Sequence, residues 1–169
     1  METKIALRYS GPAVDSGLMD VYEASANMIA FSEFVVLSAK TTFGESVTTR
    51  AEVAGFGRGS FITDLVFNVA GTTASVFSVI SIGQLWDLMK EAFNLWKHLK
   101  GKPPSKVEYS GNNATVTNNN GEIIQVTIQS LTLVMSEKGS ESVGRFVHRA
   151  LDKAGMDTVD IASDTEQIA

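Results

Sequence analysis

The chain has 169 residues, of which 44% are hydrophobic and 20% are charged, and its formal net charge is −5. This length and composition predict one globular domain and exclude a largely disordered protein. The negative charge argues against a general nucleic-acid-binding protein, and the absence of cysteine excludes disulfides, thiolate metal sites and cysteine nucleophiles.

The two ends of the sequence have different character. The N-terminal residues contain no long apolar segment after the first basic residue, which argues against a secretory signal and favours a cytoplasmic protein. The C-terminal residues are acidic and contain no base after Met156. We therefore expect one domain over residues 1–161 and an acidic, flexible tail over residues 162–169.

A strand and a long helix are expected first. Residues 4–9 have the composition of a strand, and the following Gly and Pro end it. Asp20 and Glu23 have the spacing of a capping box at a helix start, and Gly44 is a typical helix end. Apolar residues between these signals recur every three or four positions and predict one buried stripe, formed by Val21, Ala24, Met28, Phe31, Val35 and Ala39.

A hairpin follows this helix. Residues 47–53 and 61–69 alternate in polarity and are joined by a glycine-rich turn, which favours a hairpin over a phosphate-binding loop. Arg58 at the turn is a candidate partner contact. Asp64 lies in the middle of the second strand, and we expect it to form an ion pair with Arg50. Alternatively, Asp64 could act with a second carboxylate in a hydrolase.

A second helix is expected between Ser81 and Gly101. Ser81 again has capping-box spacing to a Gln, and basic residues in the last turn complement the helix dipole. Its apolar face carries Trp86 and Trp96, which are candidate ligand or partner contacts. Lysines concentrate in and after this helix, and a solvated helix face accounts for them better than an anion-binding surface.

The remaining chain predicts short elements. Residues 106–109, 114–117 and 123–127 have the composition of strands separated by glycine turns. Residues 142–153 predict a short helix, and residues 158–161 a final strand. The fold class is α+β: a ferredoxin-like β-α-β-β-α-β core with a C-terminal β-hairpin, a short helix and an edge strand.

Residues 65–86 form a run of 22 residues without a charge. Alternation at its start and a capped helix at its end indicate a composite segment, which favours a protein core and a subunit interface over a membrane span. The structure of residues 70–80 is left open. The residues of this connector that we expect at the interface of a homo-oligomer are Val76, Phe77, Val79 and Ile80.

No arrangement of residues indicates catalysis, metal binding or nucleotide binding. The two histidines, His98 and His148, are far apart in the sequence and belong to no metal-spaced motif. We therefore expect no metal and no cofactor, and the pattern favours a protein that is not an enzyme.

Several short motifs resemble those of a family of uncharacterised bacterial proteins, some of them carried by phages and mobile elements. The motifs are Ser10-Gly11-Pro12-Ala13-Val14, Gly59-Ser60-Phe61 before Asp64-Leu65, Leu99-Lys100-Gly101-Lys102, Asn120-Gly121 and Ala154-Gly155-Met156-Asp157. The resemblance implies a shared fold and a prokaryotic or phage setting. It implies no activity and no functional residue.

The expected function is that of a non-enzymatic, self-associating protein that binds a protein or a small ligand. The resemblance adds a phage, mobile-element or host-defence setting. One alternative is a membrane-acting effector that inserts residues 65–86, and a weaker one is a hydrolase that uses Asp64.

Overall fold

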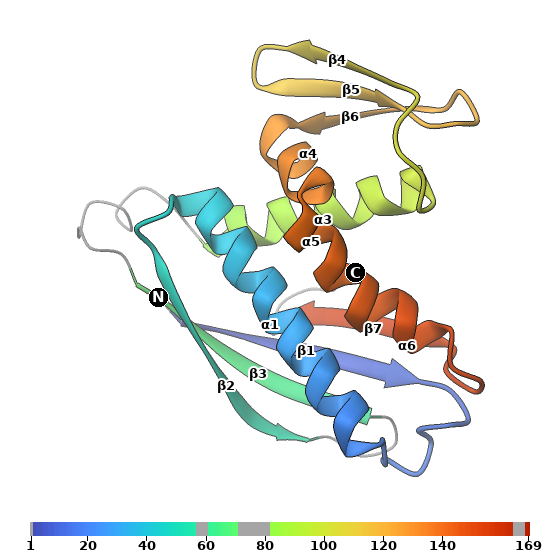
Figure 1. The fold of residues 1–169 in the computed structure, drawn as a ribbon. Coiled ribbons are helices and arrows are strands. Elements are labelled where there is room, and N and C mark those ends of the chain that lie inside the picture. Colours follow the sequence, from blue (N-terminus) through green and yellow to red (C-terminus); the bar gives the residue numbers. More distant parts are fainter. Residues whose placement is uncertain (1, 57–60, 71–81, 164–167) are drawn as a thin grey trace.

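The computed structural model describes residues 2–56, 61–70, 82–163 and 168–169 (Figure 1). Within these ranges the chain has an α+β fold with two separate antiparallel sheets. Helices connect the two sheets and cover one side of the larger one (Figure 1). The predicted fold class is confirmed at this level.

The larger sheet has four strands in the order β2-β3-β1-β7. The strands are β1 (Glu2–Ser10), β2 (Thr48–Phe56), β3 (Phe61–Ala70) and β7 (Thr158–Ser163). Central β1 pairs with β3 and with β7, and β2 pairs with β3 at one edge. These pairings confirm the predicted first strand, the hairpin and the final strand.

The two faces of this sheet differ because successive side chains of a strand point to opposite faces. In β3, buried positions alternate with partly exposed ones from Phe61 to Val69. The buried face includes Ile5, Leu65 and Phe67, each no more than 1% exposed. The helices that cover it are α1 (Val21–Phe43) and the helical segment before β7, which lie side by side (Figure 1).

Helix α1 begins and ends where its sequence predicts. The side chain of Asp20 accepts hydrogen bonds from the backbone N–H groups of Tyr22 and Glu23, at 3.0 and 3.2 Å. Gly44 ends the helix with a φ of 103°, a conformation that glycine adopts without strain. The predicted stripe is wrong at Val21, which is 66% exposed in the first turn of the helix.

Helix α3 (Ile82–Leu99) packs across the upper end of α1 (Figure 1). Its Phe93 and Trp96 rings lie 5.3 and 5.5 Å from the ring of Phe34 in α1. Helix α3 thereby joins the larger sheet and its helices to the rest of the chain.

The smaller sheet has the order β4-β5-β6 and consists of β4 (Lys106–Ser110), β5 (Asn113–Thr117) and β6 (Ile123–Thr127). All three strands were predicted. However, the strand at residues 106–109 was expected in the β-α-β-β-α-β core, and it lies in the smaller sheet instead. A continuous β-α-β-β-α-β order requires β4 beside β1, and β7 occupies that place instead. Strand β4 pairs locally with β5 across a two-residue turn, which needs no long loop closure.

The segment after β6 is helical over a longer stretch than predicted. It contains α4 (Ile128–Met135), α5 (Glu137–Val143), the π-helical segment η1 (Gly144–His148) and α6 (Arg149–Leu151). The expected helix at 142–153 covers only the last part. Ser136 separates α4 from α5: its hydroxyl donates to the Leu133 carbonyl at 2.7 Å and accepts the Gly139 N–H at 3.1 Å. This break leaves helices too short for a clear periodicity.

One hydrophobic core extends through both sheets. Phe146 in η1 lies at its centre, with ring contacts to Phe31, Phe34 and Phe93 at 5.2, 5.9 and 6.3 Å. The hydroxyl of Tyr9 donates to the Phe146 carbonyl at 2.8 Å, and burial raises the pKa of Tyr9. The π-helical turn is therefore fixed to the central strand.

The C-terminal part of the chain contributes β7 to the larger sheet. This strand continues to Ser163, two residues beyond the boundary predicted for the tail. Residues 164–167 lie outside the described ranges. The N–H groups of Ile168 and Ala169 both donate to the Ile161 carbonyl, and the Ile161 N–H donates to the Ala169 carbonyl.

The two described ends of the uncharged run belong to different elements, as predicted. Residues 65–70 belong to β3, and residues 82–86 belong to α3. Residues 71–81 lie outside the described ranges. Among the helices that the structure describes, none combines the length and the apolar character needed to cross a membrane.

Candidate functional site: a groove along α1

The residues proposed from sequence as contacts do not form one site. Trp86 is 4% exposed and belongs to the core, and Trp96 packs against Phe34 and Phe93. Trp96 therefore contributes to the packing of α3 against α1, and Trp86 contributes to the hydrophobic core. Several candidates lie outside the described ranges, namely Arg58, Val76, Phe77, Val79 and Ile80.

Asp64 lies on the sheet face opposite the helices. Its carboxylate forms an ion pair with Lys4 at 3.1 Å, and its side chain is 32% exposed. The expected pair with Arg50 is wrong, because Arg50 lies opposite Asn68 in the strand register and forms an ion pair with Glu52 at 2.6 Å. Lys4, on β1, is the nearer cation on the same face.

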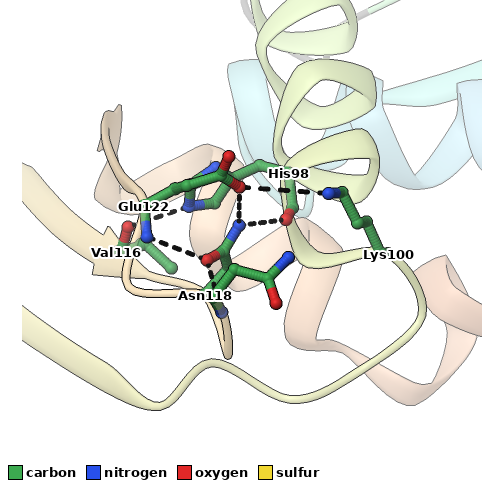
Figure 2. Close-up of polar contacts among 6 residues, drawn as sticks. His98, Lys100, Val116, Asn118 and Glu122 are labelled. Carbon is green, nitrogen blue, oxygen red and sulfur yellow. Dashed lines mark hydrogen bonds and ion pairs between the residues drawn. The ribbon is translucent and has the colours of Figure 1, made fainter.

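A polar network joins the smaller sheet to the end of α3 (Figure 2). The amide of Asn118 donates to the His98 carbonyl at 3.0 Å and to the Glu122 carboxylate at 2.6 Å, while its oxygen accepts the N–H groups of Asn120 and Glu122. The hydrogen bond from Asn118 holds the pKa of Glu122 below its ordinary value, and the charge of Lys100 acts in the same direction.

His98 also belongs to this junction, since its Nε2 lies 3.1 Å from the Val116 carbonyl. Its role is therefore more specific than the dipole interaction expected from sequence. With every polar atom of the Asn118 amide engaged inside the protein, the network has the properties of a structural junction.

A second polar cluster links α3 to α4. The Glu91 carboxylate accepts hydrogen bonds from the Thr127 N–H and the Thr127 hydroxyl, both at 2.8 Å, and from the Ser130 hydroxyl at 2.5 Å. The side chain of Thr127 also caps α4 by accepting the Ser130 N–H at 3.2 Å. A carboxylate at a helix N-terminus is stabilised by the exposed N–H groups there, so this cluster also has a structural explanation.

The feature with the geometry of a binding site is a groove of about 800 Å³ along α1. Its other walls come from β2 with Leu65 of β3, and from α5 and η1. We call it the α1 groove. Its larger apolar side chains are Met28, Ile29, Val36, Leu37, Val53 and Leu65.

The groove exists because α1 does not cover the edge strand. Val53 and Leu65 are opposite each other in the register of β2 and β3 and point to the same face. Leu65 is 1% exposed, whereas Val53 is 52% exposed. On α1, Ile29 is 58% exposed beside the same groove. Apolar surface on a strand and on a helix therefore faces solvent at one place.

Charged side chains of both signs surround this apolar surface. Arg145 in η1 lies 3.8 Å from the Glu33 carboxylate of α1 and 2.8 Å from that of Glu141 in α5. Lys40 and Lys138 also line the groove. In the described part of the chain, no cluster of three or more His, Asp or Glu side chains could hold a metal ion.

Sequence reasoning missed this groove. A usable signal was present in α1, where Met28 and Ile29 are adjacent and make the apolar surface wider than one stripe. The groove residues of α5 could not be predicted, because the sequence analysis did not recognise that Ser136 ends one helix and begins the next. Comparisons with protein-family models, curated proteins and solved structures give no match.

Proposed function

We propose that this chain is a binding protein whose ligand occupies the α1 groove. The observation that carries the proposal is an apolar floor bordered by charges of both signs, in a volume of about 800 Å³. Ligand sites typically have this size and combine apolar walls with a few polar groups that fix orientation. The matching ligand has an apolar body and at least one charged group.

Two further parts of the proposal come from the sequence. We propose that the protein is not an enzyme and that it self-associates through apolar surface, since abundant apolar residues occur without a recognisable catalytic set. The prokaryotic or phage setting rests on the family resemblance alone.

We also propose that the larger sheet and its helices form a ferredoxin-like core. The order β2-β3-β1-β7 with antiparallel neighbours supports this interpretation, with the α5–α6 segment as the second helix and residues 82–135 as an insertion. Cross-strand nuclear Overhauser effects between Leu7 and Ile161 would test the decisive pairing of β1 with β7. Their absence would contradict it.

The groove can be tested with 1-anilinonaphthalene-8-sulfonate, a dye that has an apolar ring system and one negative charge. We expect the fluorescence of the dye to rise with the wild-type protein. Ile29→Glu places a charge on the apolar floor and should weaken dye binding by about tenfold or more. The measurement is a fluorescence titration with circular dichroism as a check of folding.

Ile123→Glu is the matched control. Ile123 is 68% exposed on the smaller sheet and does not line the groove, so the same substitution there should leave dye affinity unchanged. Equal weakening by both variants, or no dye binding by the wild type, would overturn the proposal.

A further inference from the structure

The two edges of the larger sheet differ in how they are covered. At the β7 edge, the backbone of Ile161 exchanges hydrogen bonds with Ile168 and Ala169. At the other edge, β2 pairs with β3 alone in the part of the chain that the structure describes. An edge strand presents N–H and C=O groups that can pair with another strand. Strand β2 is therefore the edge available for such pairing.

The charges of β2 are self-complementary. Arg50 and Glu52 are two residues apart, so they lie on the same face, where their ion pair measures 2.6 Å. If two β2 strands pair antiparallel about a two-fold axis at Ala51, each Arg50 lies opposite the Glu52 of the second copy. Opposite charges in directly facing positions stabilise a strand pair.

The same register covers apolar surface. On the helix-facing side, Val53 of one copy lies opposite Thr49 of the other, and Ala51 lies at the axis. Val53 is 52% exposed, and the Thr49 hydroxyl is buried without a hydrogen-bond partner in the described structure. Pairing extends over residues 49–53, which are symmetric about Ala51 and pair regularly with β3 before the irregularity between Val53 and Gly55.

We propose that two copies of this chain associate through antiparallel pairing of their β2 strands, with the two-fold axis at Ala51. The two four-stranded sheets then form one continuous sheet, with both α1 helices on the same side. Because Val53 borders both the strand edge and the α1 groove, the two grooves meet at the seam. This inference rests on the self-association part of the proposed function and is independent of the ligand.

Strand β4 offers a useful comparison. It is an edge strand of the smaller sheet, and its Lys106 and Glu108 form a similar ion pair at 2.7 Å. However, β4 has five residues and does not border the groove, whereas β2 has nine and contributes to the groove wall. Length and adjoining apolar surface favour β2 as the interface, and β4 provides the control.

The experiment combines light scattering with charge reversal. Wild-type protein should have twice the mass of the 18.2 kDa chain. Arg50→Glu places like charges opposite each other in the dimer, and so does Glu52→Arg. Each variant should raise the dimer dissociation constant by about tenfold or more. An equimolar mixture of the two variants restores opposite charges across the seam and should form a heterodimer.

Glu108→Lys is the matched control, and it should leave the dimer intact. A monomeric wild type, or dimers that persist in both single β2 variants, would overturn the proposal. So would a mixture that stays monomeric although both variants show wild-type circular dichroism. Dissociation caused only by Glu108→Lys would assign the interface to β4. Dye binding is measured in a separate titration. A result that contradicts the β2 interface therefore leaves the proposal of a ligand in the α1 groove untouched.

Discussion

At the scale of single residues, Asn118 shows how one buried amide can fix a loop. Asn118 is 3% exposed, and its side chain makes four hydrogen bonds (Figure 2). Three of them fix the turn before β6, and the one to the His98 carbonyl joins this turn to the end of α3. No charged side chain could replace it, since the amide both donates and accepts. The only ionised partner of the amide is Glu122.

Asn118→Ala should lower the free energy of unfolding by about 1–3 kcal/mol at neutral pH, because it leaves the His98 carbonyl and two N–H groups without their partner. It should also raise the pKa of Glu122. A carboxyl whose pKa is lowered in the folded protein stabilises the fold at pH values above its ordinary pKa of 4.5. This stabilisation is lost as the pH falls through the lowered pKa. The difference in the free energy of unfolding between the wild type and the variant should therefore become smaller at acidic pH.

Urea denaturation at several pH values checks this, together with an NMR titration of the Glu122 carboxyl. Asn119→Ala is the control, since Asn119 is the exposed neighbour. A deficit that stays constant from neutral to acid pH would count against the assigned cause of the Glu122 shift.

At the scale of elements, Glu91 joins α3 to the start of α4. Its carboxylate receives three hydrogen bonds from Thr127 and Ser130, and Ser130 is fully buried. Glu91→Gln removes the charge and directs an N–H₂ group at hydrogen-bond donors. We expect a loss of about 1–3 kcal/mol in the free energy of unfolding, measured in urea. Glu108→Gln, on an exposed strand, should change it little.

The elements also show what the sequence could and could not predict. Strong local signals sufficed for α1, which has a cap and a glycine end, and for the hairpin strands, which alternate in polarity. The same signals failed for α4 and α5, because the break at Ser136 leaves each helix only about two turns long. The groove was missed because it depends on how far α1 extends over β2, which is a property of packing.

At the scale of the whole molecule, the order of strands depends on long-range pairing that no local pattern encodes. Strand β7 reaches β1 across most of the chain length, while β4 pairs with its immediate neighbour. The sequence analysis took residues 106–109 as the last strand of the β-α-β-β-α-β core because they follow α3 directly. The shared core, in which Val116 of the smaller sheet belongs to the same cluster as Ile5 of the larger one, could be recognised only in three dimensions.

This shared core predicts that both sheets unfold together. Phe146 contacts aromatic rings of α1 and α3, so Phe146→Ala should destabilise the whole chain by about 3–5 kcal/mol, and Phe146→Leu by less, because it leaves a smaller cavity. Tryptophan fluorescence, which reports on α3, and far-ultraviolet circular dichroism, which reports on all elements, should give one coincident urea transition in each variant. Separate transitions for the two probes in the wild type would show that the sheets are energetically independent.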